Sequence, residues 1–176
     1  MDWPAAEPIE TVRLTLEPLR VGHAGEMVRI LGDSELYEYT GGKPPSLEEL
    51  RARYAMQAVG RSPDGRRGWL NWIARERAAG AAIGTVQATL DRTGRRLSGE
   101  IAWIVGVAHQ RRGYATEAAG AMVEWLKTQG VQTITAHIHP DHRASMSVAR
   151  HLGLTPTDIV EGGETRWEGP LARRDP

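Results

Sequence analysis

The apolar positions in the first sixty residues follow two different periods. Residues 11–19 alternate between apolar and polar side chains, which predicts a half-buried strand ending near Pro18. Residues 22–31 carry apolar side chains at helical intervals, which predicts an amphipathic helix. Ser46 and Glu49 have the spacing of a capping box, so a second helix is expected after Ser46. Residues 1–10 show no period and are expected to be loosely ordered.

Three strand-like runs then follow one another closely. They cover residues 69–75, 83–90 and 100–107, and turn signals separate them at 79–80 and 91–94. Short connections favour antiparallel neighbours, so we expect a meander.

The last third of the chain alternates between helical and strand periods. Gly130 is expected to end the helix that begins near residue 115. The remaining predictions are a strand over 131–139, a short helix over 144–152, and two strands over 156–160 and 165–171. This order of elements predicts a mixed α+β fold. We expect a single domain over residues 1–176, with its core at about 11–172.

Composition narrows the possible functions. Lysine plus arginine equals aspartate plus glutamate at 22 each, so no broad basic surface for nucleic acid is expected. The sequence has no cysteine, which excludes disulfides, thiolate metal sites and cysteine nucleophiles. No apolar run approaches the roughly 18 residues that span a membrane, and the first residues do not resemble a signal peptide. We therefore expect a cytoplasmic protein.

Residues 101–118 carry the clearest chemical signal. A strand ends, a short basic turn follows, and a helix begins with small residues. The first turn of a helix presents unpaired NH groups, Arg111 and Arg112 add positive charge, and Gly113 lets the backbone approach a ligand. This pattern predicts a site for a small anion such as a pyrophosphate; an ordinary helix start beside arginines is the other interpretation. Gly106 indicates a bulge or a close backbone approach.

Four segments resemble one enzyme family. Residues 110–115 read Gln-Arg-Arg-Gly-Tyr-Ala, which is similar to the acetyl-CoA signature of the GNAT N-acetyltransferase superfamily. Residues 142–154 are similar to a second signature, in the branch that includes ribosomal-protein-alanine N-acetyltransferases. Residues 12–19 and 100–103 resemble two strands of the same branch. The resemblance covers residues 11–167.

The resemblance implies a fold and a cofactor site. It implies a mixed, mostly antiparallel sheet of about seven strands, splayed between the fourth and fifth, with about four helices. Acetyl-CoA would lie in the splay as co-substrate, with no metal. The implied contacts are the backbone of Val105 and Val107 with the pantetheine arm, and the NH groups from Arg111 to Ala115 with the pyrophosphate. The full cofactor-binding set is Val105, Gly106, Val107, Gln110, Arg111, Arg112, Gly113, Tyr114, Ala115, His142 and Ser145.

The same resemblance implies catalytic roles. Glu100 is the leading general base, although a salt-bridged residue at a strand end is an equal interpretation; Glu164 is a second candidate. A backbone NH near Gly106 would stabilise the oxyanion. Ser145 would protonate or order the leaving thiolate, unless its hydroxyl bonds the carbonyl four residues earlier.

Two positions depart from the family pattern. Ala149 stands where many relatives carry a tyrosine acid, so the role of general acid is vacant or passes to Ser145 or water. His142 replaces an asparagine, which puts the pantetheine contact at that position in question.

Several features bear on the acceptor and on partners. Aromatic side chains are candidate walls of an acceptor pocket, with core packing as the other interpretation: Tyr37, Tyr39, Trp72 and Trp103. Such a pocket would suit a small-molecule amine or a peptide N-terminus. His137 and His139 share a strand face, but nothing completes a metal site. We expect no nucleic-acid or membrane partner, and a homodimer is compatible with the sequence. The alternative function is a non-catalytic CoA-binding sensor.

Overall fold

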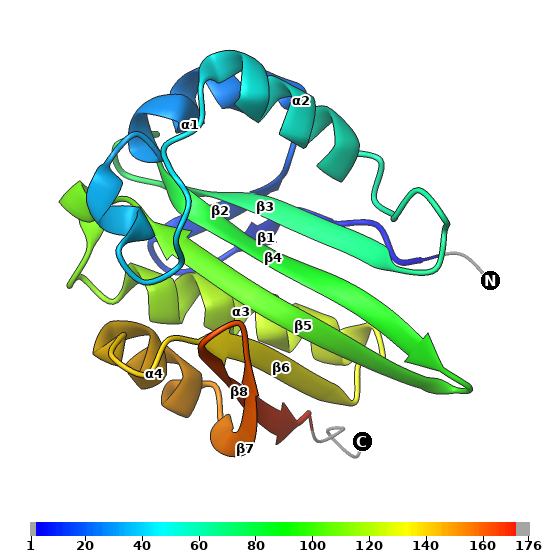
Figure 1. Ribbon diagram of the computed structural model, residues 1–176. Helices are drawn as coiled ribbons and strands as arrows, with labels where there is room; N and C mark the ends of the chain where they lie inside the picture. The colour runs from blue at the N-terminus through cyan, green and yellow to red at the C-terminus, as the bar shows by residue number, and fades with distance from the viewer. Residues whose placement is uncertain (1–2, 172–176) are drawn as a thin grey trace.

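The computed structural model describes residues 3–171, which form one twisted sheet with helices on both faces (Figure 1). The eight strands are ordered β1-β2-β3-β4-β5-β6-β8-β7. Every neighbouring pair is antiparallel except β5 and β6. The strands are β1 (Ile9–Glu10), β2 (Leu14–Pro18), β3 (Gly68–Glu76), β4 (Ala82–Thr93), β5 (Arg96–Val105), β6 (Thr133–Ile138), β7 (Thr155–Glu161) and β8 (Glu164–Pro170).

The helices follow the signals in the sequence. They are α1 (Ala24–Ile30), α2 (Leu47–Gln57), α3 (Tyr114–Thr128) and α4 (Arg143–His151), with 3-10 turns η1 (Val21–His23), η2 (Ser34–Tyr37) and η3 (Val107–His109). The capping box is confirmed, because the Glu49 NH donates to Ser46 Oγ at 3.1 Å and the Ser46 NH donates to Glu49 Oε2 at 2.7 Å. Gly130 follows α3 with a φ of +81°, as expected of a C-terminal glycine. None of the helices within residues 3–171 is long and apolar enough to cross a membrane.

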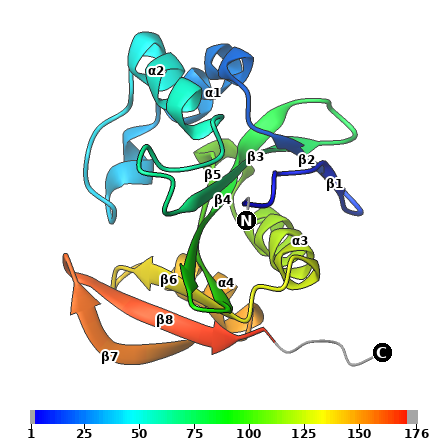
Figure 2. The ribbon, with the colours of Figure 1, turned by 90° about the vertical axis from the view of Figure 1, so that its right-hand side faces the viewer.

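Two hydrophobic clusters hold the layers together. The larger lies between the sheet and α3, and includes Trp72, Met122 and Ile134, all fully buried. The smaller lies under α1 and α2 and includes Met27, Leu50 and Ile73. Figure 2 shows α3 and α4 on one side of the sheet and α1 and α2 on the other. The α1–α2 pair covers one end of its sheet face, over β3 and the start of β4.

The sheet opens between β5 and β6. These strands pair only where Ser98–Glu100 lies beside Thr133–Thr135. Beyond that point β5 continues to Val105 and β6 continues to Ile138, but the two strands do not pair with each other. The predicted splay is therefore present, and it follows the fifth strand rather than the fourth because β1 adds a strand at the N-terminal edge.

Two local predictions are wrong. Part of the lead over residues 1–10 is ordered, since β1 pairs with β2 and the Trp3 indole NH donates to the Gly65 carbonyl at 3.0 Å; residues 1 and 2 lie outside the described part of the chain. The turn expected over residues 91–94 comes later, because β4 extends to Thr93 and pairs there with Arg96. The third strand of the meander consequently begins at Arg96, four residues before the expected position.

Candidate functional site

The edge of β5 that borders the splay exposes main-chain groups. The Gly106 NH donates to the carbonyl of Ile83 in β4 at 2.8 Å. Backbone groups alternate in direction along an antiparallel strand, so those of Trp103 and Val105 point the other way, into the splay. β6 does not pair there. The gap between the strands is thus bordered by backbone that has no strand partner.

The turn after β5 presents a row of NH groups. Arg111 and Gly113 take left-handed conformations, with φ of +60° and +78°, which curl the chain into the start of α3. Among residues 3–171, no acceptor bonds the main-chain NH groups of residues 111–116, and no side chain caps α3. Arg111 and Arg112 are exposed. The turn therefore has the geometry and charge to bind an anion.

The turn is held from beneath by a residue that the sequence analysis did not identify. Arg13 Nε lies 2.6 Å from Glu117 Oε2, and Arg13 Nη1 donates to the Arg112 carbonyl at 2.9 Å. The Arg13 guanidinium also stacks on the Tyr114 ring at 4.5 Å. Tyr114 is buried and donates to Glu76 Oε1 at 2.6 Å, a bond that raises the pKa of the phenol. Only the main chain of Tyr114 is therefore available to a ligand.

Three of the expected cofactor contacts are modified by the structure. Gln110 Nε2 donates to the Val105 carbonyl at 3.0 Å, so that carbonyl has an internal partner. Val107 lies in η3 rather than in the strand, and its carbonyl accepts from the Gln110 NH at 3.2 Å. The Gly106 NH is engaged by Ile83, so it is not available as the oxyanion donor. A Cβ at Gly106 would lie 2.8 Å from the Ile30 side chain and 3.4 Å from the Ile83 carbonyl oxygen, so the tight neighbour there is a side chain rather than the expected backbone.

On the other side of the splay, three side chains gather at the start of α4. Ser145 Oγ lies 3.4 Å from His142 Nε2. His142 stacks on Tyr39, with ring centroids 4.6 Å apart, and so connects α4 to the segment that precedes α2. Burial, followed by the nearby charge of His139, lowers the pKa of His142 and favours its neutral form. Within the described chain the Ser145 hydroxyl makes no bond to the carbonyl four residues earlier.

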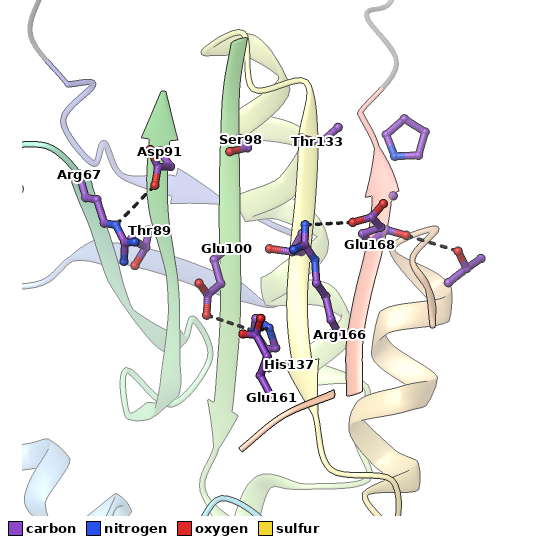
Figure 3. Close-up of a pocket in the computed structure, with 14 residues that line it drawn as sticks. Arg67, Thr89, Asp91, Ser98, Glu100, Thr133, His137, Glu161, Arg166 and Glu168 are labelled. Carbon is purple, nitrogen blue, oxygen red and sulfur yellow. Dashed lines mark hydrogen bonds and ion pairs between the residues drawn. The ribbon is translucent and has the colours of Figure 1, made fainter. Parts of the chain in front are cut away.

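A polar cleft of about 740 Å³ lies on the sheet face that also carries α1 and α2, beside the end that these helices leave open (Figure 3). It is lined from β4, β5, β6 and the β7–β8 hairpin. Its charged or titratable side chains are Arg67, Asp91, Glu100, His137, Glu161, Arg166 and Glu168. Its hydroxyl side chains are Thr89, Ser98, Thr133, Thr135 and Thr155, and Gly169 and Pro170 complete the lining.

Glu100 stands where the splay begins. It is the last residue of β5 that pairs with β6, and its side chain projects into the cleft. Its Oε1 lies 3.3 Å from His137 Nδ1, while His137 Nε2 lies 3.4 Å from Glu161 Oε2 without hydrogen-bond geometry. One imidazole therefore stands between two carboxylates from different strands. Glu100 and His137 are each candidates in the sequence, whereas Glu161 is not, because it comes close to them only through the β7–β8 hairpin.

The aromatic candidates do not line this cleft. Trp72 is fully buried, donates to the Glu7 carbonyl at 2.7 Å and packs edge-on against Trp125 in the core. Trp103 lies on the opposite face of β5 from Glu100 and packs against the larger cluster. Tyr37 donates to the Leu31 carbonyl at 2.8 Å, and burial raises the pKa of its phenol. Core packing, the other interpretation of these residues, describes Trp72 and Trp103.

The remaining candidates are also placed. Glu164 is the cross-strand neighbour of Glu161 but does not line the cleft. His139 Nδ1 accepts from the Asp141 NH at 3.2 Å. No group of three metal-ligating side chains is suitably placed within residues 3–171. Ala149, at the position of the absent tyrosine, is fully buried in the larger cluster.

Comparison with known proteins identifies a family. Residues 13–155 match the family model described as an acetyltransferase (GNAT) domain. No curated protein sequence matches the chain significantly.

Solved structures share the fold at low sequence identity. A GNAT-family acetyltransferase from Bacillus anthracis aligns with a TM-score of 0.74 and 16% identity, covering 96% of this chain and all of that one. RimL, a ribosomal L7/L12 alpha-N-protein acetyltransferase in complex with coenzyme A, aligns at 0.72 and 13% identity over 94% and 98% of the two chains. The microcin C7 self-immunity acetyltransferase MccE, in complex with acetyl-CoA and AMP, aligns at 0.73 and 12% identity over 92% and 94%.

Proposed function

Because the chain belongs to the GNAT acetyltransferase family, we propose that it transfers the acetyl group of acetyl-CoA to a primary amine by direct attack in a ternary complex. The observation that supports this most strongly is the turn over residues 110–115, in which the NH groups from residue 111 onward are unbonded and open beside the splay. A diphosphate bound there would meet backbone donors, the N-terminal end of α3 and two arginines. When bound, acetyl-CoA supplies the activated carbonyl.

The residues present fit this co-substrate. From the turn, β5 runs back five residues from Val105 to Glu100, a distance of roughly 17 Å at the usual rise of a strand. Along that length the main-chain groups of Trp103 and the NH of Val105 are directed into the splay. An extended arm anchored at the turn would thus have polar partners along β5 and would end near Glu100.

We assign the role of general base to Glu100. A primary ammonium is largely protonated near neutral pH, so it must lose a proton before its nitrogen can attack. The nitrogen then bonds to the carbonyl carbon as the carbon–sulfur bond breaks, and the products are an amide, CoA thiol and one released proton. The Glu100 carboxylate is about half exposed to the cleft and is hydrogen-bonded by His137, which can hold it in position.

The geometry of the splay also suggests an oxyanion donor and a proton donor for the leaving thiolate. The Trp103 NH is the first amide of β5 that points into the gap beyond the pairing with β6, so we assign it as the oxyanion donor in place of the engaged Gly106. We assign proton delivery to the thiolate to Ser145, whose hydroxyl lies beside the neutral imidazole of His142. With Ser145 as proton donor, the proposed mechanism needs no tyrosine as general acid.

Two measurements test the proposal. Calorimetric titration with acetyl-CoA should show binding, and Arg111→Gln should weaken it, whereas Arg95→Gln, in the exposed β4–β5 turn, should not. A CoA-release assay over small amines and peptides should then find a turned-over acceptor. Absence of binding would overturn the proposal, and tight binding without turnover of any acceptor would indicate the CoA-binding sensor.

The structural neighbours do not indicate whether this chain acetylates a peptide N-terminus or a small amine. RimL is described as acting on a ribosomal protein, whereas MccE is described as a self-immunity enzyme bound to AMP. Both share this fold, so a peptide N-terminus and a small amine are each compatible with it. The choice has to come from the lining of the cleft.

A further inference from the structure

The floor of the cleft carries hydroxyl groups that are not used by the protein. Thr89, Ser98, Thr133 and Thr135 line it from three adjacent strands. Within residues 3–171 none of these four side chains makes a hydrogen bond, whereas Thr11, Ser46 and Thr157 all do. Each free hydroxyl can both donate and accept a hydrogen bond. The floor therefore offers a group of unused polar partners to whatever occupies the cleft.

The charges around this floor leave two carboxylates without a permanent cation. Arg67 lies 3.5 Å from Asp91, and Arg166 lies 3.0 Å from Glu168, so those two carboxylates are paired. Within the described chain, the carboxylates of Glu100 and Glu161 have His137 as their only ion-pair partner. Four carboxylates against two guanidinium groups give the cleft an excess of negative charge. This excess is located beside the proposed base and favours a cationic ligand.

The lining also differs from that of a pocket for an apolar group. Ligand sites for hydrophobic molecules are mostly walled by aromatic and aliphatic side chains. Pro170 supplies the only hydrocarbon ring of this lining, the His137 imidazole is its only aromatic ring, and no branched aliphatic side chain takes part. An apolar acceptor would strip water from the hydroxyl groups without replacing their hydrogen bonds.

We propose that the acceptor is a polar amine that carries several hydroxyl groups, of the amino sugar or amino polyol class, and that its ammonium contacts the exposed carboxylates of Glu100 and Glu161 from the cleft, beside the His137 imidazole that they flank. The hydroxyl groups of the acceptor would exchange hydrogen bonds with Thr89, Ser98, Thr133 and Thr135. Glu161 thereby becomes a binding residue supplied by the C-terminal hairpin. This inference rests on the proposed acetyl transfer and specifies its acceptor.

The first test compares acceptors of matched shape. Glucosamine, galactosamine and mannosamine are assayed against cyclohexylamine, which has a six-membered ring without hydroxyl groups, and against a peptide with an N-terminal alanine. We expect kcat/KM for at least one amino sugar to exceed that for cyclohexylamine and for the peptide by at least about tenfold, because a site built on hydrogen bonds discriminates strongly against analogues that lack them. Equal or faster turnover of cyclohexylamine or the peptide would overturn the inference.

The second test uses variants of the floor. Thr89→Val and Thr135→Val each remove one hydroxyl at almost constant volume and should lower kcat/KM for the preferred amino sugar about two- to tenfold. The kcat/KM for cyclohexylamine should not fall in these variants, because an apolar acceptor makes no hydrogen bond to the hydroxyl that is removed. Thr93→Val is the matched control, because Thr93 lies on the same strand and face as Thr89 but outside the cleft. A loss shared by all three variants, or by both substrates, would contradict a role for these hydroxyl groups in recognition.

The third test concerns the ammonium site. Glu161→Gln should raise the KM for the amino sugar about tenfold or more and leave the KM for acetyl-CoA unchanged, since a hydrogen bond to a charged group is lost. Asp158→Asn, on the same strand but outside the cleft, should change neither value. An unchanged KM for the amino sugar in Glu161→Gln would exclude this residue from the site.

The outcomes separate this inference from the proposed function. If acetyl-CoA binds and an apolar amine or a peptide is the better acceptor, acetyl transfer stands and the polar acceptor does not. If acetyl-CoA does not bind, or binds while every acceptor fails, both proposals fall.

Discussion

Glu100 shows what a single residue can and cannot reveal in a sequence. Its position predicted either a general base or one partner of a salt bridge. The structure places it against His137 rather than against a lysine or arginine, and leaves its carboxylate open to the cleft. The contact joins residues 37 positions apart, across a parallel pair of strands. Local periodicity contains no information about such a pairing.

Replacing Glu100 tests its role directly. Glu100→Gln keeps the shape of the side chain but removes the proton acceptor, so kcat should fall by about 100-fold or more. Acetyl-CoA affinity, measured by calorimetry, should be unchanged. Glu48→Gln, in the exposed first turn of α2, is the control. A variant with full kcat would show that another group accepts the proton.

A similar substitution tests Ser145. Ser145→Ala should lower kcat about tenfold while acetyl-CoA still binds, because the hydroxyl acts only as the thiolate leaves. The control is Ser147→Ala, an exposed serine in the same helix. Equal rates in the two variants would remove Ser145 from the mechanism.

The residues that sequence reasoning missed share one property. Arg13, Glu76 and Glu161 reach the site from segments far from it in the sequence, and each is an ordinary charged residue in its own segment. Trp72 is the converse, an aromatic side chain whose type suggested a binding role but whose strand face is buried. Only the pairing of strands distinguishes such cases.

Among the elements, the turn before α3 depends on β2. Arg13 holds Glu117, the Arg112 carbonyl and the Tyr114 ring at once. It is a positioning residue, because it contacts the back of the turn and not the proposed anion site.

Removing Arg13 should therefore loosen the anion site. Arg13→Gln should raise the KM for acetyl-CoA about five- to tenfold with a smaller change in kcat, because loss of the paired charge costs roughly 1 kcal/mol at a partly exposed site. Arg29→Gln, an exposed arginine of α1, is the comparison. A fall in kcat with an unchanged KM would contradict this role.

A second ionic contact attaches α1 to the sheet. Glu26 accepts two hydrogen bonds from the Arg75 guanidinium, at 2.9 and 3.0 Å, and one from the Ala82 NH at 2.8 Å. The bonds from Arg75, with help from Ala82, hold the pKa of Glu26 below its usual value of 4.5 despite the opposing effect of burial.

The pKa shift of Glu26 gives a pH dependence. A carboxyl group with a lowered pKa in the folded state stabilises the protein above its usual pKa, and this contribution is lost as the pH falls below about 4.5 towards the lower folded value. Glu26→Gln should lower stability at pH 7 by about 1 kcal/mol, since the side chain is partly exposed, and the melting temperature by roughly 2–4 °C. The difference from the wild type, followed by thermal melts, should shrink in acid. A constant difference down to pH 3 would contradict the assignment.

The sequence predicted elements well where a local signal was strong. The capping box at Ser46 and the glycine after α3 each depend on a few neighbouring residues, and both are confirmed. The turn expected over residues 91–94 was misplaced because polar residues continue β4 on its exposed face as far as Thr93. β1 is only two residues long and has no period to detect.

At the scale of the whole molecule, one sheet face is divided between a structural half and a proposed acceptor half. The α1–α2 pair covers the first, and the β7–β8 hairpin borders the second (Figure 1). Resemblance to a family predicted the splay, since the order of segments specifies the topology. It did not predict the chemistry of the cleft, whose lining is assembled from residues between Arg67 and Pro170. The cleft that we propose as the acceptor site is lined by hydroxyl groups and carboxylates, whereas the sequence had suggested aromatic walls.

Because β5 and β6 pair over only a short length, the sheet has two internal edges whose backbone groups lack interstrand hydrogen bonds. A ligand that forms hydrogen bonds with these edges stabilises the folded chain, because only the folded form can bind it. At one hundred times its dissociation constant, acetyl-CoA should add about 2.7 kcal/mol. Scanning fluorimetry should then show a melting temperature roughly 5–10 °C higher, and Arg111→Gln should reduce this gain at the same ligand concentration.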